Sequence, residues 1–208
     1  MEFTQAQIRQ QYDQAAPWYD RQLSRVEGLM GIARLRRNLL RKATGNVLEI
    51  AVGTGRNFSC YPAACTITGV DPSTEMLEHA RKRAEKLHMH PRLLAMNAEE
   101  LSFTDQSFDT VVSSLSLCTI PHPLAALREM VRVCRPDGKA LFLEHGRSTA
   151  AWLAYLQDRY SDVWYRNFIG CRWNREPLAL VEEAGFDVLS ARRSLFGILH
   201  AIEARPKL

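Results

Sequence analysis

The residues best suited to binding a ligand are concentrated around a turn of small residues. Ala51, Gly53 and Gly55 follow an apolar run that contains Glu49, and a second apolar run ends at Asp71. A glycine has no Cβ, so its backbone can turn tightly and approach a ligand closely. The Asp71 carboxylate offers two acceptor oxygens, which suit the paired hydroxyls of a ribose. Together the turn and this carboxylate predict a nucleoside site.

The acidic residue inside the turn narrows the kind of nucleoside. Glu49 would repel the pyrophosphate of a dinucleotide and attract a cation. No glycine follows three residues after Gly55, although the dinucleotide fingerprint requires one. A glycine turn alone also fits an ordinary strand-to-helix connection, so the nucleoside prediction depends on Asp71 as well.

The elements that must position these residues alternate between strand and helix. Strands are predicted at residues 47–50, 66–71, 92–96, 108–114, 140–143, 186–189 and 196–202. We expect a helix start at residues 57–58, a helix from about residue 74 and a turn at residues 135–138. The run at 108–114 is apolar towards its end, which places it at the centre of a parallel sheet. Such a sheet binds ligands outside the carboxyl ends of its strands.

The motif around Glu49 and the run Gly69-Val70-Asp71-Pro72-Ser73 resemble the first two motifs of class I S-adenosylmethionine-dependent methyltransferases. The resemblance implies an α/β fold with a Rossmann-like, seven-stranded, mostly parallel sheet, an antiparallel C-terminal hairpin and helices on both faces. It implies S-adenosyl-L-methionine as the cofactor and S-adenosyl-L-homocysteine as the product. Glu49 then lies near the methionine portion and Asp71 holds the ribose. Ala51 stands where that family usually has glycine.

The same resemblance implies a set of cofactor residues. Met76 takes the place beside the adenine face, and Asn97 stands where the family usually has an aspartate that contacts the adenine amino group. The amide oxygen of Asn97 can still accept that hydrogen bond. The cofactor-binding residues are predicted to be Tyr19, Glu49, Ala51, Gly53, Gly55, Asp71, Pro72, Met76, Asn97, Ala98, Ser113 and Ser114.

The four tryptophans mark the rest of the site. Trp18 precedes the cofactor half, and Trp152, Trp164 and Trp173 follow the fifth strand. One domain is expected, with an N-terminal helical cap (1–42), a cofactor-binding core (43–146), a helical substrate cap (147–175) and a C-terminal helix and hairpin (176–208). The aromatic spacing in the substrate cap fits either a helix packed on the domain or a substrate chamber. The predicted substrate pocket contains Tyr12, Trp18, Glu144, Trp164 and Cys171.

Finer resemblances concern the methyl acceptor. The runs 117–120, 143–145 and 170–176 resemble alkyl-thiol S-methyltransferases over about residues 45 to 205, and the run 12–20 resembles the opening of quinone-type methyltransferases. Other relatives methylate phosphatidylethanolamine, and a pseudoenzyme would bind the cofactor without transferring a methyl group. A thiol acceptor must ionise, which a nearby cation or base favours. His145, Arg172 and Arg175 are therefore the predicted catalytic residues.

Composition sets the remaining expectations. The net charge of +4 is modest and dispersed, so a small-molecule acceptor is expected and nucleic acid is not. No apolar run is long enough to cross a bilayer, which predicts a cytoplasmic protein. The pattern formed by Arg21, Arg25, Arg34, Arg36 and Arg37 with apolar neighbours is more typical of a helix packed on its own domain; the alternative is a basic amphipathic helix on a membrane surface. The five cysteines include no C-x-x-C pair, so no metal site is expected.

Overall fold

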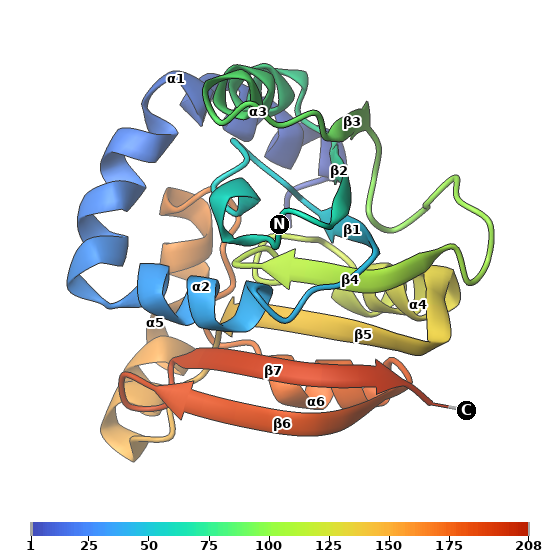
Figure 1. The fold of residues 1–208 in the computed structure, drawn as a ribbon. Helices are drawn as coiled ribbons and strands as arrows, with labels where there is room; N and C mark the ends of the chain where they lie inside the picture. Colours follow the sequence, from blue (N-terminus) through green and yellow to red (C-terminus); the bar gives the residue numbers. More distant parts are fainter. Residues whose placement is uncertain (1, 208) are drawn as a thin grey trace.

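A computed structural model describes residues 2–207 of the chain, apart from the side chains of residues 22–26 and 29. Its centre is a seven-stranded sheet with the order β3-β2-β1-β4-β5-β7-β6 (Figure 1). The strands are β1 (Asn46–Ile50), β2 (Thr66–Asp71), β3 (Arg92–Ala95), β4 (Phe108–Ser114), β5 (Cys134–His145), β6 (Phe186–Ser194) and β7 (Leu199–Pro206). The strands from β3 to β5 are parallel, and β7 is antiparallel to both of its neighbours. The predicted fold and the central place of β4 are confirmed.

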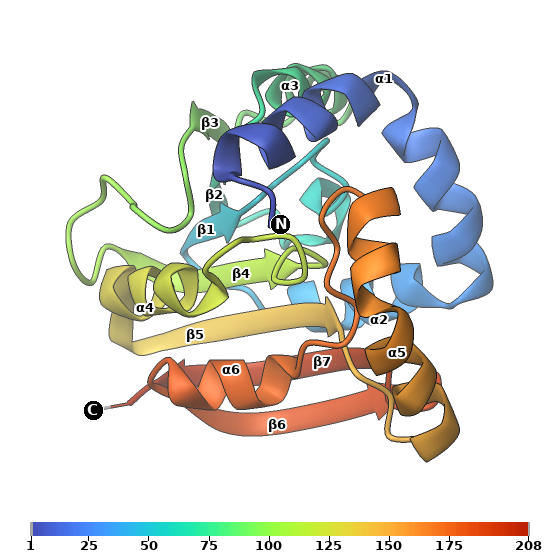
Figure 2. The ribbon, with the colours of Figure 1, turned by 180° about the vertical axis from the view of Figure 1, so that it is seen from behind.

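The helices cover both faces of the sheet. They are α1 (Gln5–Leu29), α2 (Ile32–Leu40), α3 (Thr74–Lys86), α4 (Pro123–Val133), α5 (Ala151–Asn167) and α6 (Pro177–Glu183). Figures 1 and 2 show α2 and α3 on one face and α4 and α6 on the other. Each face has its own apolar layer, with Leu77 and Leu141 in one and Leu127 and Phe142 in the other. Burial of each such side chain contributes about 1.5–3 kcal/mol.

Two helices lie beyond the carboxyl ends of the parallel strands. Both views place α1 and α5 beside the arrowheads of β4 and β5. The α1 helix changes direction along its length (Figure 2) and contains Pro17, which lacks a backbone N–H and interrupts the helical hydrogen bonds. The binding end of the sheet is thereby enclosed from two sides.

Three local predictions are wrong. Residues 135–138 do not form a separate turn, because they belong to β5, where the pairing with β4 shifts register between Phe108 and Thr110. Only a 3-10 turn, η1 (Phe58–Cys60), follows the glycine turn, since Tyr61 precedes a proline and is extended. The last strand begins at Leu199, later than predicted, because the residues before it close the hairpin, with positive φ at Leu195 and Phe196.

The basic N-terminal segment does not form the alternative, uniformly lipid-facing helix. Arg36 is buried and bonded to Glu27, so it does not belong to an exposed basic face. Arg25 lies among the side chains outside the described set. Within residues 2–207, no helix is both long and apolar enough to cross a membrane.

Candidate active site

The turn after β1 is shaped by left-handed backbone. Ala51, Gly53 and Gly55 have φ angles of 47°, 54° and 75°. A Cβ at Gly53 would meet no atom within 4 Å, so the space above this residue is open. A Cβ at Gly55 would lie 2.3 Å from the Phe58 ring. Gly53 thus leaves room for a ligand, and Gly55 lets the turn close over the core.

Asp71 is fixed at the end of β2. Its side chain accepts hydrogen bonds from the backbone N–H of Gly53 at 2.8 Å and of Ser73 at 2.9 Å. Burial raises its pKa to about 6, although these two bonds favour the charged form. Each carboxylate oxygen has two lone pairs, so acceptor capacity remains for a ligand in the cavity that Asp71 lines.

Glu49 is 2% exposed and lies beneath the turn. Its two oxygens accept hydrogen bonds from Asn57 Nδ2 and from the Tyr61 hydroxyl, each at 2.7 Å. Burial raises the pKa of Glu49 to about 7, because removal from water opposes the carboxylate more than the two donors stabilise it. A cation bound in the cavity would favour the ionised form.

A buried ion network joins α1 to the turn. Glu27 accepts two hydrogen bonds from Arg36, at 2.6 and 2.7 Å, and one from Arg56 at 2.6 Å. Asp20 accepts hydrogen bonds from the Thr54 hydroxyl at 2.7 Å and from Arg56 at 3.1 Å. Among the described residues, Arg36 Nε has no hydrogen-bond partner although it is buried at the cavity. This cation can serve an anionic group of a ligand.

The sequence reasoning did not assign this network to the site. The sequence pattern places Arg36 in a basic amphipathic helix, Arg56 at the end of the glycine turn and Asn57 at a helix start. The sequence feature that could have assigned Arg56 and Asn57 to the site is their position directly after the glycine turn. Side chains at this position lie at the same end of the sheet as the site.

A cavity of about 350 Å³ connects the turn with α5, within the size range of small-molecule sites. The following predicted site residues line it: Tyr12, Trp18, Tyr19, Glu49, Ala51, Gly53, Asp71, Pro72, Met76, Asn97, Ala98, Ser114, His145, Trp164 and Cys171. We call the part lined by Tyr12, Cys118, His145, Trp164 and Cys171 the acceptor end, and the part around the turn and Asp71 the cofactor end. The remaining predicted residues do not line the cavity: Gly55, Ser113, Glu144, Arg172 and Arg175.

Glu144 does not line the cavity, contrary to its predicted place in the substrate pocket. It is fully buried and accepts hydrogen bonds from the Ser113 hydroxyl at 2.6 Å and from the backbone N–H of Ser116 at 3.0 Å and of Leu117 at 3.2 Å. Burial raises its pKa to about 7. Glu144 and Ser113 therefore hold the loop after β4 instead of meeting a ligand.

The two predicted catalytic arginines also lie outside the cavity wall. Arg172 forms ion pairs with Glu2 at 2.7 Å and Asp162 at 3.1 Å. Arg175 donates hydrogen bonds to the backbone oxygens of Leu117 and, at 2.7 Å, of Ile120. Arg175 is thus placed to support the loop after β4, and Arg172 is occupied at the surface.

Aromatic rings close the acceptor end. Trp164 stacks between Phe168, at a centroid distance of 3.8 Å, and Trp173, at 4.2 Å. Trp152 and Tyr155, from the same aromatic pattern, are 62% and 65% exposed. Of these aromatic residues, Trp164 lines the cavity, whereas Trp152 and Tyr155 do not.

Three residues with soft or imidazole ligand atoms meet in the acceptor end. Cys171 Sγ lies 3.4 Å from His145 Nε2, and one ligand atom of each of Cys118, His145 and Cys171 lies within 4.8 Å of the others. Burial disfavours charged His145, but the hydrogen bond with Cys171 and the neighbouring carboxyl of Glu144 outweigh it and raise its pKa. Contact with Cys118, together with burial, raises the pKa of Cys171. The cysteine spacing, which lacks a C-x-x-C pair, gave no indication of this cluster.

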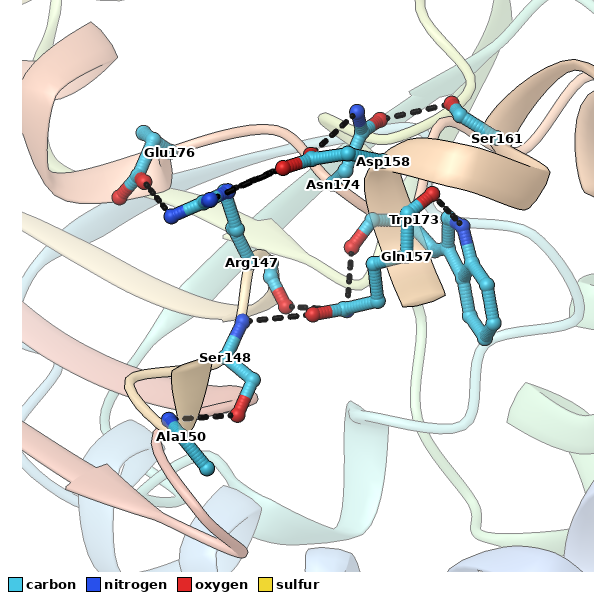
Figure 3. A network of polar contacts seen from close by, with 10 residues as sticks. Arg147, Ser148, Ala150, Gln157, Asp158, Ser161, Trp173, Asn174 and Glu176 are labelled. Carbon is cyan, nitrogen blue, oxygen red and sulfur yellow. Dashed lines mark hydrogen bonds and ion pairs between the residues drawn. The ribbon is translucent and has the colours of Figure 1, made fainter. Parts of the chain in front are cut away.

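A polar network holds the two segments that carry His145 and Cys171 (Figure 3). Gln157 accepts a hydrogen bond from Ser148 N at 2.7 Å and donates to the oxygens of Gly146 at 3.1 Å and Trp173 at 3.0 Å. The Trp173 indole donates back to Gln157 O at 3.0 Å. Since Gln157 is 1% exposed, α5 is locked to the end of β5 and to the loop after α5.

Comparison with known proteins agrees with this geometry. A family model described as a methyltransferase domain matches residues 48–142. The chain is 35% identical over 147 residues to a phosphatidylethanolamine N-methyltransferase of Cereibacter sphaeroides, covering 67% of this chain and 72% of that protein. It is 34% identical over 148 residues to the human thiol S-methyltransferase TMT1A, covering 69% of this chain and 61% of that protein.

A solved structure supports the fold. The PH0226 protein from Pyrococcus horikoshii superposes with a TM-score of 0.69 at 22% identity, covering 85% of this chain and 90% of that one. At this identity the likeness concerns the fold alone.

Proposed function

The chain belongs to the S-adenosylmethionine-dependent methyltransferases, and from that premise we propose that its methyl acceptor is a small, apolar thiol. The cofactor supplies an electrophilic methyl group when it is bound. The relatives act on different acceptors, so the choice between thiol, quinol and lipid amine depends on the chemistry of the acceptor end. The observation that carries the proposal is the placement of His145 and two sulfur atoms there.

The proposed binding mode assigns the cofactor end to S-adenosylmethionine. Asp71 accepts hydrogen bonds from the ribose hydroxyls, and Met76 and Asn97 contact the adenine. The carboxylate of Glu49 lies on the side of the methionine portion, where positive charge is carried. Arg36 Nε, which has no partner among the described residues, suits the cofactor carboxylate. The open space above Gly53 supports this fit.

The distribution of carboxylates argues against a cationic amine as acceptor. Glu27, Glu49 and Asp71 are the carboxylates among the described residues of the cavity wall, and all belong to the cofactor end. An amine is an ammonium ion when it arrives from water, and its methylated product is again an ammonium ion, which needs a paired anion when it is buried. The acceptor end offers sulfur, imidazole and aromatic groups instead, which suit a thiol attached to an apolar group.

The chain's own residues then contribute position and local charge. The rings of Tyr12 and Trp164 and the loop residue Ile120 line the acceptor end and exclude water. Holding the acceptor close to the reactive carbon in a dry site supplies a large part of the barrier reduction. His145 is the wall residue that we assign to favouring the ionised thiol. We leave Arg172 out of this role because its ion pairs hold it at the surface.

A transfer screen tests the proposal. The full chain is incubated with radiolabelled S-adenosylmethionine and, separately, with an alkyl thiol, an aryl thiol, a quinol and phosphatidylethanolamine vesicles. We expect label in the thiols. Trp164→Ala should reduce that transfer, whereas Trp152→Ala, the same change at a 62% exposed position, should not. Label in the quinol or the lipid, with none in either thiol, would refute the proposed acceptor.

A further inference from the structure

The cluster of Cys118, His145 and Cys171 carries chemistry beyond a hydrogen bond. Among the described residues, these three form a group of potential metal ligands whose ligand atoms all lie within 4.8 Å of one another. Thiolate and imidazole are the ligands that zinc prefers, and three protein ligands with one open position are typical of catalytic zinc sites. The sequence did not predict this set of ligands, because its members come from three separate segments of the chain.

The spacing of the ligand atoms fits one metal ion. With bond lengths of about 2.3 Å to sulfur and about 2.0 Å to nitrogen, tetrahedral zinc places a sulfur and a nitrogen ligand about 3.5 Å apart. The observed separation of Cys171 Sγ and His145 Nε2 is 3.4 Å. The same bond lengths place two sulfur ligands about 3.8 Å apart. The sulfur atoms of Cys118 and Cys171 lie within 4.8 Å of each other, which is compatible with this separation.

The backbone holds the three ligands in place. Arg172 N donates to Cys118 O at 2.8 Å, which joins the segments of the two cysteines. Ile169 and Gly170, immediately before Cys171, have φ angles of 49° and 68°. A β-branched residue in this region is costly, and such strain concentrates at ligand and active sites.

The surroundings suit a pair of thiolates. Arg175 donates hydrogen bonds to the backbone oxygens of Leu117 and Ile120, on either side of Cys118 in the chain, so a fixed cation lies beside this ligand segment. Two thiolates, a neutral imidazole and a divalent ion sum to zero charge, so the occupied site needs no further counterion. All three ligand residues line the cavity, so the fourth position faces the acceptor end.

We infer that Cys118, His145 and Cys171 bind a zinc ion whose fourth position takes the sulfur of the methyl acceptor. This inference rests on the proposed thiol acceptor. The thiol loses its proton to water as its sulfur coordinates the metal. The thiolate sulfur then donates an electron pair to the methyl carbon, and the bond between that carbon and the sulfonium sulfur breaks with its electron pair left on the cofactor. The products are a neutral thioether and S-adenosylhomocysteine.

Zinc X-ray absorption on the full chain tests the inference without any substitution. We expect one zinc per chain, with two sulfur ligands and one imidazole. Addition of propanethiol with S-adenosylhomocysteine should raise the sulfur ligands from two to three. Absence of bound zinc, or zinc without sulfur ligands, would overturn the metal site. A sulfur count that stays at two would overturn the role of the metal in holding the thiol.

Cobalt substitution and ligand variants give an independent readout. Cobalt-loaded protein should show a thiolate-to-cobalt absorption band, which Cys118→Ser and Cys171→Ser should weaken or lose. Cys65→Ser, in a half-buried cysteine outside the cavity wall, is the matched control and should keep it. Equal thiol methylation by chelator-treated and zinc-loaded protein would overturn the inference while the proposed acceptor stood. Conversely, transfer only to a quinol, with two-sulfur zinc still present, would refute the proposed acceptor and the thiol-binding role but not the metal ligands.

Discussion

Replacement of Glu49 by glutamine tests two effects of this carboxylate separately: the loss of folding stability caused by its burial, and its contribution to binding of the cofactor. The substitution keeps the side-chain size and removes the ionisable group. The new amide oxygen can accept from Asn57 Nδ2, and its NH2 can donate to the Tyr61 hydroxyl oxygen, the two groups that now bond Glu49. We therefore expect Glu49→Gln to fold, with its stability and its cofactor affinity changed in opposite directions.

The magnitude follows from the raised pKa. Burial moves the pKa of Glu49 from 4.5 to about 7, so the folded protein binds this proton more tightly than the unfolded chain. The associated stability is fully present below pH 4.5 and is lost as the pH rises to about 7. At about 1.4 kcal/mol per pKa unit, the loss is up to about 3 kcal/mol. Glu49→Gln avoids this loss, so its advantage over the wild type should grow by that amount across this pH range.

Urea unfolding between pH 4.5 and 8, with and without the substitution, measures the difference curve. Carboxyls that titrate with folding without interacting with Glu49, such as Glu144, cancel in the difference. The same substitution at exposed Glu85 controls for net charge. A difference that does not change with pH would refute the burial argument. In calorimetry at pH 8, the variant should bind S-adenosylmethionine about 10- to 100-fold more weakly, the loss of a charged hydrogen bond; equal affinity would refute the role of Glu49 beside the cofactor's positive charge.

Further predictions concern the turn, the ribose and the acceptor end. Asp71→Asn should weaken cofactor binding about tenfold or more in calorimetry, and an unchanged dissociation constant would exclude a ribose contact. Gly55→Ala should lower the free energy of unfolding by roughly 2–5 kcal/mol, since it adds left-handed strain and a clash with the Phe58 ring. Ala51→Gly should leave stability unchanged or raise it by up to about 1 kcal/mol, because the φ of 47° disfavours alanine; a loss measured by the same urea unfolding would contradict this. Trp164→Phe should raise the KM for an apolar thiol without affecting the cofactor dissociation constant, and a change in the latter alone would place the tryptophan at the wrong end.

The cofactor end could be predicted because its information is local. Strand, turn, second strand and carboxylate follow one another within about 25 residues, from Val47 to Asp71, and parallel pairing of β1 with β2 then fixes their relative positions. The segment after β4 could not be predicted in the same way. Glu144 lies at a strand end, like Asp71, yet it faces backbone N–H groups instead of the cavity. Strand-end position selects the edge of the sheet but not the direction of the side chain.

The acceptor end depends on contacts between distant segments. Cys118, His145 and Cys171 meet only when the loop after α5 packs against the end of β5 and the loop after β4. Periodicity also gave no means of choosing between the two sides of α5, because Trp152 and Trp164 both fit an aromatic helical pattern. Trp152 faces solvent, whereas Trp164 stacks against Trp173.

Methyl transfer requires that the cofactor and the acceptor be held at a fixed separation, and the loop after β4 joins the two ends. Ser114 and Ser116 line the cavity beside the turn, whereas Cys118 and Ile120, a few residues on, line the acceptor end. Glu144 accepts hydrogen bonds from backbone N–H groups of this loop, and Arg175 donates to its backbone oxygens. Neither residue needs to touch a ligand for its loss to change the geometry of transfer. Burial of Glu144 and Arg175 lowers the stability of the fold. Their role in holding a rigid loop between the two binding ends accounts for their presence here.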